Sequence, residues 1–269
     1  MIIYLNIMCI LLPFFWPLPI IMGLRYFFKA KMDLKNTGMI DISDLIVSYG
    51  KNRVINGLNI KIEPGTVHGL VGLNGSGKTT LLNTLYGLKK MDSGKITYKD
   101  LPVKRTDLAY FETENYFYPY ITGKEYLQMF RSQNTSFNIA GWNQLFDLPL
   151  DKLTETYSTG MKKKLAFMGL ISLNRNIYIL DEPFNGIDLE TVQKIKALLI
   201  KLKENNKTII ITSHILESLL SLCDFISYLN GGIIQFTKEK KDFASVETEI
   251  FSVHKDHFNK QIQLLLGSD

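Results

Sequence analysis

Cysteine is scarce in this chain of 269 residues, which contains two, Cys9 and Cys223. Two cysteines cannot build the disulfide framework of a small secreted domain, and they lack the paired spacing of a zinc site. The four histidines also follow no metal-ligand spacing: His68, His214, His254 and His257. The sequence therefore favours a reducing compartment, and His68, which falls in an apolar run, is expected to be a buried core residue.

A basic stripe is also missing. Lys and Arg number 31 against 26 Asp and Glu, and the net charge of +5 is scattered along the chain. One tight cluster, Lys162–Lys164, stands apart. Because nucleic-acid surfaces gather basic residues on one face, we expect no nucleic-acid partner. With 46% hydrophobic and 21% charged residues, the composition is that of an ordinary globular protein with no visible internal repeat.

Charge is absent altogether from residues 1–24. That length resembles a membrane span, and the basic residues that follow from Arg25 would leave the remainder of the chain in the cytoplasm. Three prolines in its second half oppose a spanning helix, and a basic start and a small-residue cleavage site are lacking. Residues 1–38 are thus either a membrane anchor or sequence upstream of a true start at Met32 or Met39.

A phosphate-binding pattern is the most informative feature that is present. Residues 72–79 read GLNGSGKT, which satisfies G-x-x-x-x-G-K-[ST]. The apolar run Val67–Val71 precedes the pattern as an expected strand, and residues 79–85 follow as an expected helix. In that context the loop amides and the helix N-terminus bind phosphate. The residues expected to bind a nucleotide here are Gly72, Asn74, Gly75, Ser76, Gly77, Lys78, Thr79 and Thr80.

Lys78 should reach the β- and γ-phosphates, and the Thr79 hydroxyl should hold Mg²⁺. A second apolar run, residues 176–180, ends at Asp181 and Glu182. Because this run reads as a buried parallel strand, its carboxyl end should lie beside the phosphate loop. We expect Asp181 to hold Mg²⁺ and Glu182 to orient or deprotonate the attacking water.

Several further segments resemble the ATP-binding cassette (ABC) superfamily, in the family's order. Residues 157–161, YSTGM, resemble its signature motif, and residues 181–188 resemble its Walker B segment leading into the D-loop. Residues 208–214 resemble its switch-histidine strand. The resemblance implies ATP and Mg²⁺ as cofactors, with His214 acting beside Glu182. It further implies that Tyr49 stacks on adenine and that Ser158 and Gly160 meet the γ-phosphate.

The chain departs from the family pattern at two places. The signature reads Y-S-T-G-M in place of L-S-G-G-Q, although Ser158 and Gly160 are retained. The Q-loop glutamine is missing, and Thr113 stands at its position between Glu112 and Glu114. Either acid could take over the metal or water contact, Thr113 could do so itself, or the loop could act through its backbone.

Alternating strand-like and helix-like segments predict an α/β fold with a mainly parallel sheet. The resemblance implies that the fold is a P-loop NTPase (RecA-like) core with an antiparallel β subdomain and a small α-helical subdomain of ABC type. We assign residues 39–237 to the ATPase domain, with the helical subdomain at about 112–165. Residues 238–269 form a tail that we expect to be a small packing element.

Aromatic residues crowd the entry to the helical subdomain. They are Tyr110, Phe111, Tyr116, Phe117, Tyr118 and Tyr120. In a transport cassette this region faces the groove that receives a helix of the membrane subunit, and aromatics with polar tips suit such an interface. The alternative is that most of them pack the subdomain core.

Two function classes follow from the resemblance. The first is an ATPase subunit that pairs with a second cassette, expected to be identical, and powers a separate transmembrane permease from the cytoplasmic face of the membrane. The short helical subdomain and the YSTGM signature look most like exporters of antibiotic or bacteriocin type. The second is a soluble ABC ATPase acting in translation, repair or cofactor assembly. The tandem cassettes or long coiled-coil insertion expected of translation or repair members do not occur in this sequence.

Overall fold

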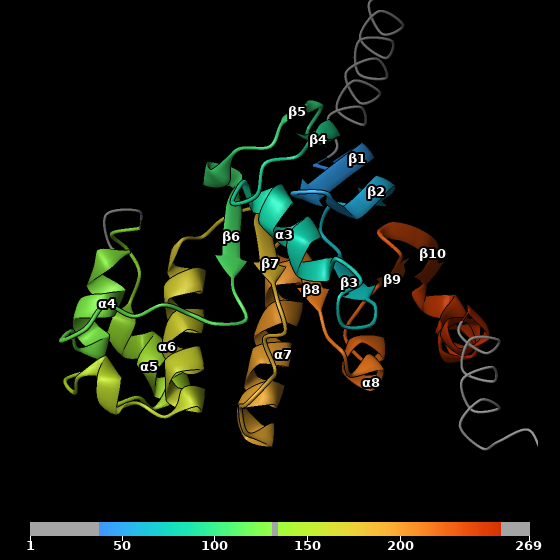
Figure 1. The fold of residues 1–269 in the computed structure, drawn as a ribbon. Coiled ribbons are helices and arrows are strands. Elements are labelled where there is room, and N and C mark those ends of the chain that lie inside the picture. Colours follow the sequence, from blue (N-terminus) through green and yellow to red (C-terminus); the bar gives the residue numbers. More distant parts are fainter. Residues whose placement is uncertain (1–37, 131–133, 254–269) are drawn as a thin grey trace, which may run out of the picture.

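The computed structural model describes residues 38–130 and 134–253 (Figure 1). Its strands are β1 (Ile40–Tyr49), β2 (Asn52–Ile62), β3 (Val67–Val71), β4 (Ser93–Tyr98), β5 (Leu101–Pro102), β6 (Leu108–Phe111), β7 (Ile177–Leu180), β8 (Thr208–Thr212), β9 (Phe225–Asn230) and β10 (Ile233–Glu239). Its helices are α3 (Lys78–Tyr86), α4 (Gly123–Met129), α5 (Ile139–Phe146), α6 (Thr159–Ser172), α7 (Leu189–Glu204) and α8 (Leu216–Leu220), with 3-10 turns η1 (Arg105–Asp107), η2 (Thr154–Thr156) and η3 (Lys240–Ser245). Within these ranges, no helix has both the length and the apolarity needed to cross a membrane. The expectations for residues 1–37 lie outside the described residues.

The larger sheet has the strand order β10-β9-β3-β8-β7-β6. Strands β6, β7, β8, β3 and β9 run parallel to their neighbours, and β10 pairs antiparallel with β9 at the edge. Every residue of β3, β7 and β8 is buried, because helices and a second sheet cover the two faces. The mainly parallel sheet is therefore confirmed. Since β3 and β7 run in the same direction, the loops that follow them emerge at one edge.

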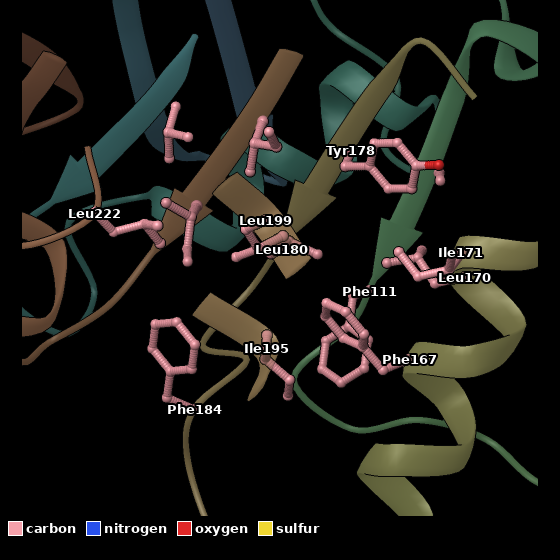
Figure 2. Close-up of a cluster of buried hydrophobic side chains, with 14 of the residues drawn as sticks. Phe111, Phe167, Leu170, Ile171, Tyr178, Leu180, Phe184, Ile195, Leu199 and Leu222 are labelled. Atoms are coloured by element: carbon pink, nitrogen blue, oxygen red, sulfur yellow. The ribbon is translucent and has the colours of Figure 1, made fainter. Parts of the chain in front are cut away.

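Alternate side chains of the larger sheet enter two separate cores. In β7, Ile177 and Ile179 pack with residues of β1, β2 and α3, whereas Tyr178 and Leu180 pack with residues of α6 and α7. This alternation follows from the two-residue period of a strand. Figure 2 shows the second core, where the Phe111 ring meets the Phe167 ring edge-on with centroids 5.7 Å apart. That contact fixes the middle of α6 against β6.

The smaller sheet is antiparallel, with the order β2-β1-β4-β5. Strands β1 and β2 pair closely, and Tyr49 faces Asn52 across a turn that contains Gly50 in a left-handed conformation (φ 59°). The inner face of this sheet packs on α3, the helix that follows the phosphate loop. The strand that ends at Tyr49 is therefore held in place by its packing on α3. The expected antiparallel β subdomain is thereby confirmed.

The helices α4 and α5 and the start of α6 group on one side of the sheet, beyond β6 (Figure 1). Helix α4 begins with a capping box, in which the Glu125 N–H donates to Thr122 Oγ1 and the Thr122 N–H donates to the Glu125 carboxylate. Our boundary near residue 165 falls inside α6, which continues to Ser172 and is buried against the sheet. Helix α6 therefore belongs to both parts, and the division into subdomains stays a prediction.

The start of the tail packs on the main domain. Phe243 of η3 and Val246 are buried in the same core as α6 and α7, and residues 246–253 are helical. Lys238 of β10 forms an ion pair with Glu249 at 2.7 Å. The apolar stretch at residues 262–266, which we also assigned to a packing element, lies outside the described residues.

Candidate functional site

The phosphate loop connects β3 to the first turn of α3. Two of its glycines are required sterically, since a Cβ on Gly72 would lie 2.4 Å from the Leu229 carbonyl oxygen and one on Gly77 would lie 2.8 Å from Ile55 Cδ1. Gly77 also has a φ of 107°, which side chains rarely adopt. Gly77 caps α3 without any side-chain hydrogen bond. The amides of the first helical turn are consequently available to an anion, and the helix dipole favours one there.

A cavity of about 710 Å³ opens beside this loop. The predicted residues that line it are Asn74, Gly75, Gly77, Lys78, Thr79, Thr80, Asp181, Glu182 and His214. Gly72 and Ser76 do not line the cavity, and they pack against each other within the loop. The cavity has the volume of a small-molecule site and gathers cationic, hydroxyl and carboxylate groups, as a phosphorylated ligand requires.

Sequence reasoning missed part of the lining. Asn52 and Val54 of β2 contribute at one end, and Asn185 contributes beyond Glu182. Thr113 also lines the cavity, and its hydroxyl lies 3.5 Å from the Asp181 backbone oxygen, whereas Glu112 and Glu114 are exposed and outside the lining. Thr113 is one of the candidates that the sequence offers for the missing Q-loop glutamine, but no motif marks Asn52 or Val54.

Asp181 occupies a corner that suits a divalent cation. It is 1% exposed, and its two carboxylate oxygens accept hydrogen bonds from Thr79 Oγ1 at 2.8 Å and Thr212 Oγ1 at 2.6 Å. One carboxylate and one hydroxyl are hard oxygen ligands of the kind that Mg²⁺ takes together with phosphate oxygens and water. Among residues 38–130 and 134–253, no group of three or more His, Cys, Asp and Glu forms a metal cluster. The Asp181 carboxylate and the Thr79 hydroxyl fit a Mg²⁺ ion whose other ligands are phosphate oxygens and water.

Glu182 is held by Thr212 and His214. Its backbone is left-handed (φ 49°), and its N–H donates to Thr212 Oγ1 at 2.9 Å. One carboxylate oxygen, Oε2, lies 2.9 Å from His214 Nδ1 and accepts the His214 N–H at 3.3 Å. The Glu182 side chain is 13% exposed. A carboxylate oriented in this way at the edge of the cavity can accept a proton from a water molecule that attacks a phosphate.

Lys78 places a cation across the cavity from these acids. Its Nζ donates to the Gly72 carbonyl at 2.7 Å and to the Leu73 carbonyl at 3.2 Å. Burial lowers the pKa of Lys78, while the charges of Glu182 and Asp181 act in the opposite direction. The ammonium is therefore fixed by its own loop at a place where phosphate oxygens can meet it.

Besides Gly72 and Ser76, three predicted site residues lie outside the cavity lining: Tyr49, Ser158 and Gly160. Tyr49 is half exposed, and the Lys89 ammonium lies over its ring at 4.1 Å from the centroid. Ser158 caps α6 by accepting the Met161 N–H at 3.2 Å, and a Cβ on Gly160 would lie 3.6 Å from the Gly186 carbonyl oxygen. The structure thus does not bring the signature residues to the phosphate loop of their own chain.

The aromatic residues at the entry to the helical subdomain divide into two groups. Phe111 is buried, Tyr110 is partly buried and donates to Asn83, and the Phe117 ring packs on the Tyr126 ring. The other three are exposed by more than half: Tyr116 at 68%, Tyr118 at 51% and Tyr120 at 80%. Half of the cluster therefore packs the interior, and Tyr116, Tyr118 and Tyr120 form an exposed tyrosine patch, for which docking stays a prediction.

Comparison with known proteins agrees with this geometry. Residues 55–185 match the family model described as ABC transporter. The chain is 31% identical over 222 residues to the ABC transporter ATP-binding protein YtrB of Bacillus subtilis (strain 168), covering 78% of this chain and 76% of YtrB. It is 30% identical over 225 residues to the lantibiotic transport ATP-binding protein SrtF of Streptococcus pyogenes, covering 80% of this chain and 96% of SrtF.

Solved structures share the fold. The ATP-binding subunit of an ABC transporter superimposes with a TM-score of 0.68 at 24% identity, covering 76% of this chain and 91% of that subunit. A dimeric ATP-binding cassette in a post-hydrolysis state with ADP and phosphate superimposes with a TM-score of 0.66 at 20% identity, covering 75% of this chain and 98% of that cassette. The expected P-loop NTPase core of ABC type is thereby confirmed.

Proposed function

This chain belongs to the ATP-binding proteins of the ABC transporter family, which hydrolyse ATP, and from that premise we propose that it dimerises and powers a separate membrane permease for export. The observation that carries the proposal is the cavity in which Lys78, Asp181 and Glu182 converge beside a phosphate loop. Export is supported by SrtF, a relative named for lantibiotic transport, whose length the chain covers to 96%.

We assign the phosphates of ATP to the loop amides and Lys78. Thr79 and Asp181 would hold Mg²⁺, which when bound reduces the negative charge of the phosphates and orients them. Glu182 orients the attacking water and takes its proton, and His214 keeps the Glu182 carboxylate directed at the cavity. We assign adenine to the half-exposed ring of Tyr49, over which the Lys89 ammonium lies in this structure.

The distance of the signature from its own phosphate loop supports a shared site. Ser158 and Gly160, at the start of α6, do not line the cavity of their own chain. The helix dipole favours an anion at that end of α6. We propose that they meet the γ-phosphate bound to a second copy. In a two-fold dimer, each ATP is then enclosed by the loop of one copy and the signature of the other.

The exposed tyrosine patch is our candidate contact with the permease. Three large aromatics with polar tips are exposed between residues 116 and 120, and the Tyr116 and Tyr118 rings meet edge-on. Such side chains suit a protein interface that water also reaches. Docking there would hold the chain at the cytoplasmic face of the membrane. The test is binding to membranes that contain a co-expressed permease encoded by a neighbouring gene. If the chain instead serves a non-transport process, it will hydrolyse ATP but will not bind these membranes.

The chemistry is tested by two substitutions. Glu182→Gln removes the proton acceptor and should lower turnover roughly 100-fold or more, while Mg-ATP binding stays near that of the wild type. Lys78→Ala removes the cation facing the phosphates and should weaken nucleotide binding itself. Steady-state hydrolysis and equilibrium binding of a fluorescent ATP analogue separate the two effects.

A matched control is Glu204→Gln, because Glu204 lies at the exposed end of α7 and pairs with Lys201 there. This control should leave both measurements unchanged. Turnover near wild type in Glu182→Gln would contradict the assignment of Glu182, and unchanged ATP affinity in Lys78→Ala would contradict that of the loop.

A further inference from the structure

Lys163 is a buried cation that the proposed chemistry does not use. It lies on α6, five residues after Ser158, and is 7% exposed, as is Lys78. Unlike Lys78, it is outside the lining of the cavity. Burial lowers the pKa of Lys163, while the charge of Glu182 raises it. Because burying an ammonium is unfavourable unless it is paired, its partner indicates what it does.

The partner is the backbone of Glu182. Lys163 Nζ lies 3.3 Å from the Glu182 carbonyl oxygen and donates to it. Glu182 has a φ of 49°, a left-handed conformation that is unfavourable for a residue with a side chain. Such a conformation persists where its surroundings fix it. The Thr212 hydroxyl fixes the Glu182 N–H, and Lys163 fixes the other end of the same residue.

Helix α6 is joined to the segment after Glu182 at two more places. Lys164 forms an ion pair with Asp188 at 3.6 Å, and a Cβ on Gly186 would lie 3.5 Å from Thr159 Cγ2. Residues 182–188 therefore lie along the first two turns of the signature helix. Lys163 makes the contact nearest to the carboxylate.

We propose that Lys163 is a positioning residue that holds the Glu182 backbone from the signature helix, so that the aim of the Glu182 carboxylate depends on where α6 lies. The inference rests on the proposed role of Glu182. It gives the signature a second task within its own chain. When Ser158 and Gly160 engage a nucleotide on a second copy, any movement of α6 changes the position of the carboxylate in this copy. The two sites of a dimer are then linked through Lys163.

A packing role for Lys163 predicts a different result from a positioning role. Methionine has a similar length and no charge, so Lys163→Met removes a buried ammonium without leaving a cavity, while the Glu182 carbonyl loses one donor. Lys163→Met should therefore keep the fold, with a melting temperature within a few degrees of that of the wild type. It removes the donor to Glu182, so the carboxylate loses its alignment, and a misplacement of that kind lowers turnover roughly 10- to 100-fold.

The test compares kcat, KM and equilibrium ATP binding in the full chain. Lys163→Met should lower kcat while KM and ATP affinity stay within about twofold, since only the water-activating step is affected. Lys163→Arg keeps a long cationic donor and should restore most of kcat. Lys162→Met is the matched control, because Lys162 lies on the same helix and makes no side-chain hydrogen bond or ion pair with the described residues. It should keep kcat within about twofold of the wild type.

Each other result overturns the proposal or its premise. If Glu182→Gln abolishes turnover but Lys163→Met does not change kcat, Lys163 is a packing residue. If Lys163→Arg falls as far as Lys163→Met, or Lys162→Met falls equally, the contact with the Glu182 carbonyl is not the cause. If Glu182→Gln itself retains turnover, the proposed chemistry fails instead. Should Lys163→Met not fold, Lys163→Leu replaces it, since leucine also lacks a donor, with the same expected loss of kcat.

Discussion

The buried histidine of the central strand makes stability depend on pH in a way that can be calculated. His68 lies in β3 and is 1% exposed. Its Nε2 is 2.8 Å from the Ser227 hydroxyl, and its ring stacks on Phe225. Nδ1 has no hydrogen-bond partner in the part of the chain that the structure describes. A proton added at Nδ1 would therefore be buried without an acceptor, and burial lowers the pKa of His68 from 6.5 to about 4.

The sign of the effect follows from where the proton binds. Between the two pKa values the unfolded chain is protonated at His68 and the folded chain is not, so acid favours unfolding. The stabilisation is fully present above pH 6.5 and is lost as the pH falls toward 4. One pKa unit corresponds to about 1.4 kcal/mol, so the complete loss is about 3 kcal/mol and the loss at pH 5 is about 2 kcal/mol.

The assay is urea unfolding followed by circular dichroism at pH 7.5 and pH 5.0. His68→Gln stays neutral at both pH values and retains an amide that can bond to Ser227. Carboxylates titrate in both proteins, so the difference between the two proteins isolates His68. The wild type should lose about 2 kcal/mol more than His68→Gln between these pH values. Equal losses in the two proteins would refute the buried, neutral state of His68.

Two further predictions concern the shared site and the altered loop. Mixing Lys78→Ala protein with Ser158→Arg protein should restore hydrolysis, because a mixed dimer keeps one intact pair of loop and signature; the absence of recovery at every ratio would argue against sharing. Thr113→Ala should raise the Mg²⁺ concentration needed for half-maximal hydrolysis, since Thr113 lines the cavity, whereas Glu112→Ala and Glu114→Ala should not. A shift in either acid variant, with none in Thr113→Ala, would move the function of the missing glutamine to that acid.

The catalytic edge could be predicted from the sequence because its strands are covered on both faces. Strands β3 and β7 are apolar apart from His68 and are buried throughout, which distinguishes them from strands that meet water. Each is followed directly by chemically informative residues. Parallel strands in one sheet place such residues together, so Lys78 and Asp181 could be paired before their positions were known. The order of the strands within the sheet is not needed for that step.

The end of the cavity that β2 lines could not be predicted in the same way. Val54 lines the cavity because β2 turns back after Tyr49 and packs on the phosphate loop, where a Cβ at Gly77 would lie 3.3 Å from the Val54 side chain. Lys89 reaches Tyr49 because α3 packs under the smaller sheet. Both contacts join segments that are far apart in the chain, and no periodicity within either segment reports them.

The lysine cluster shows the same limit at the level of single side chains. Successive residues of a helix point about 100° apart, so Lys162, Lys163 and Lys164 must face three directions once α6 forms. The sequence thus predicts that they separate, but the direction of each depends on how α6 is rotated against the sheet. The Phe167 ring, one turn later, sets that rotation by packing on Phe111. Lys163 points toward the protein interior with Phe167, because residues four apart share a helix face. One ammonium of a lysine run that looks exposed in the sequence therefore donates to the Glu182 carbonyl.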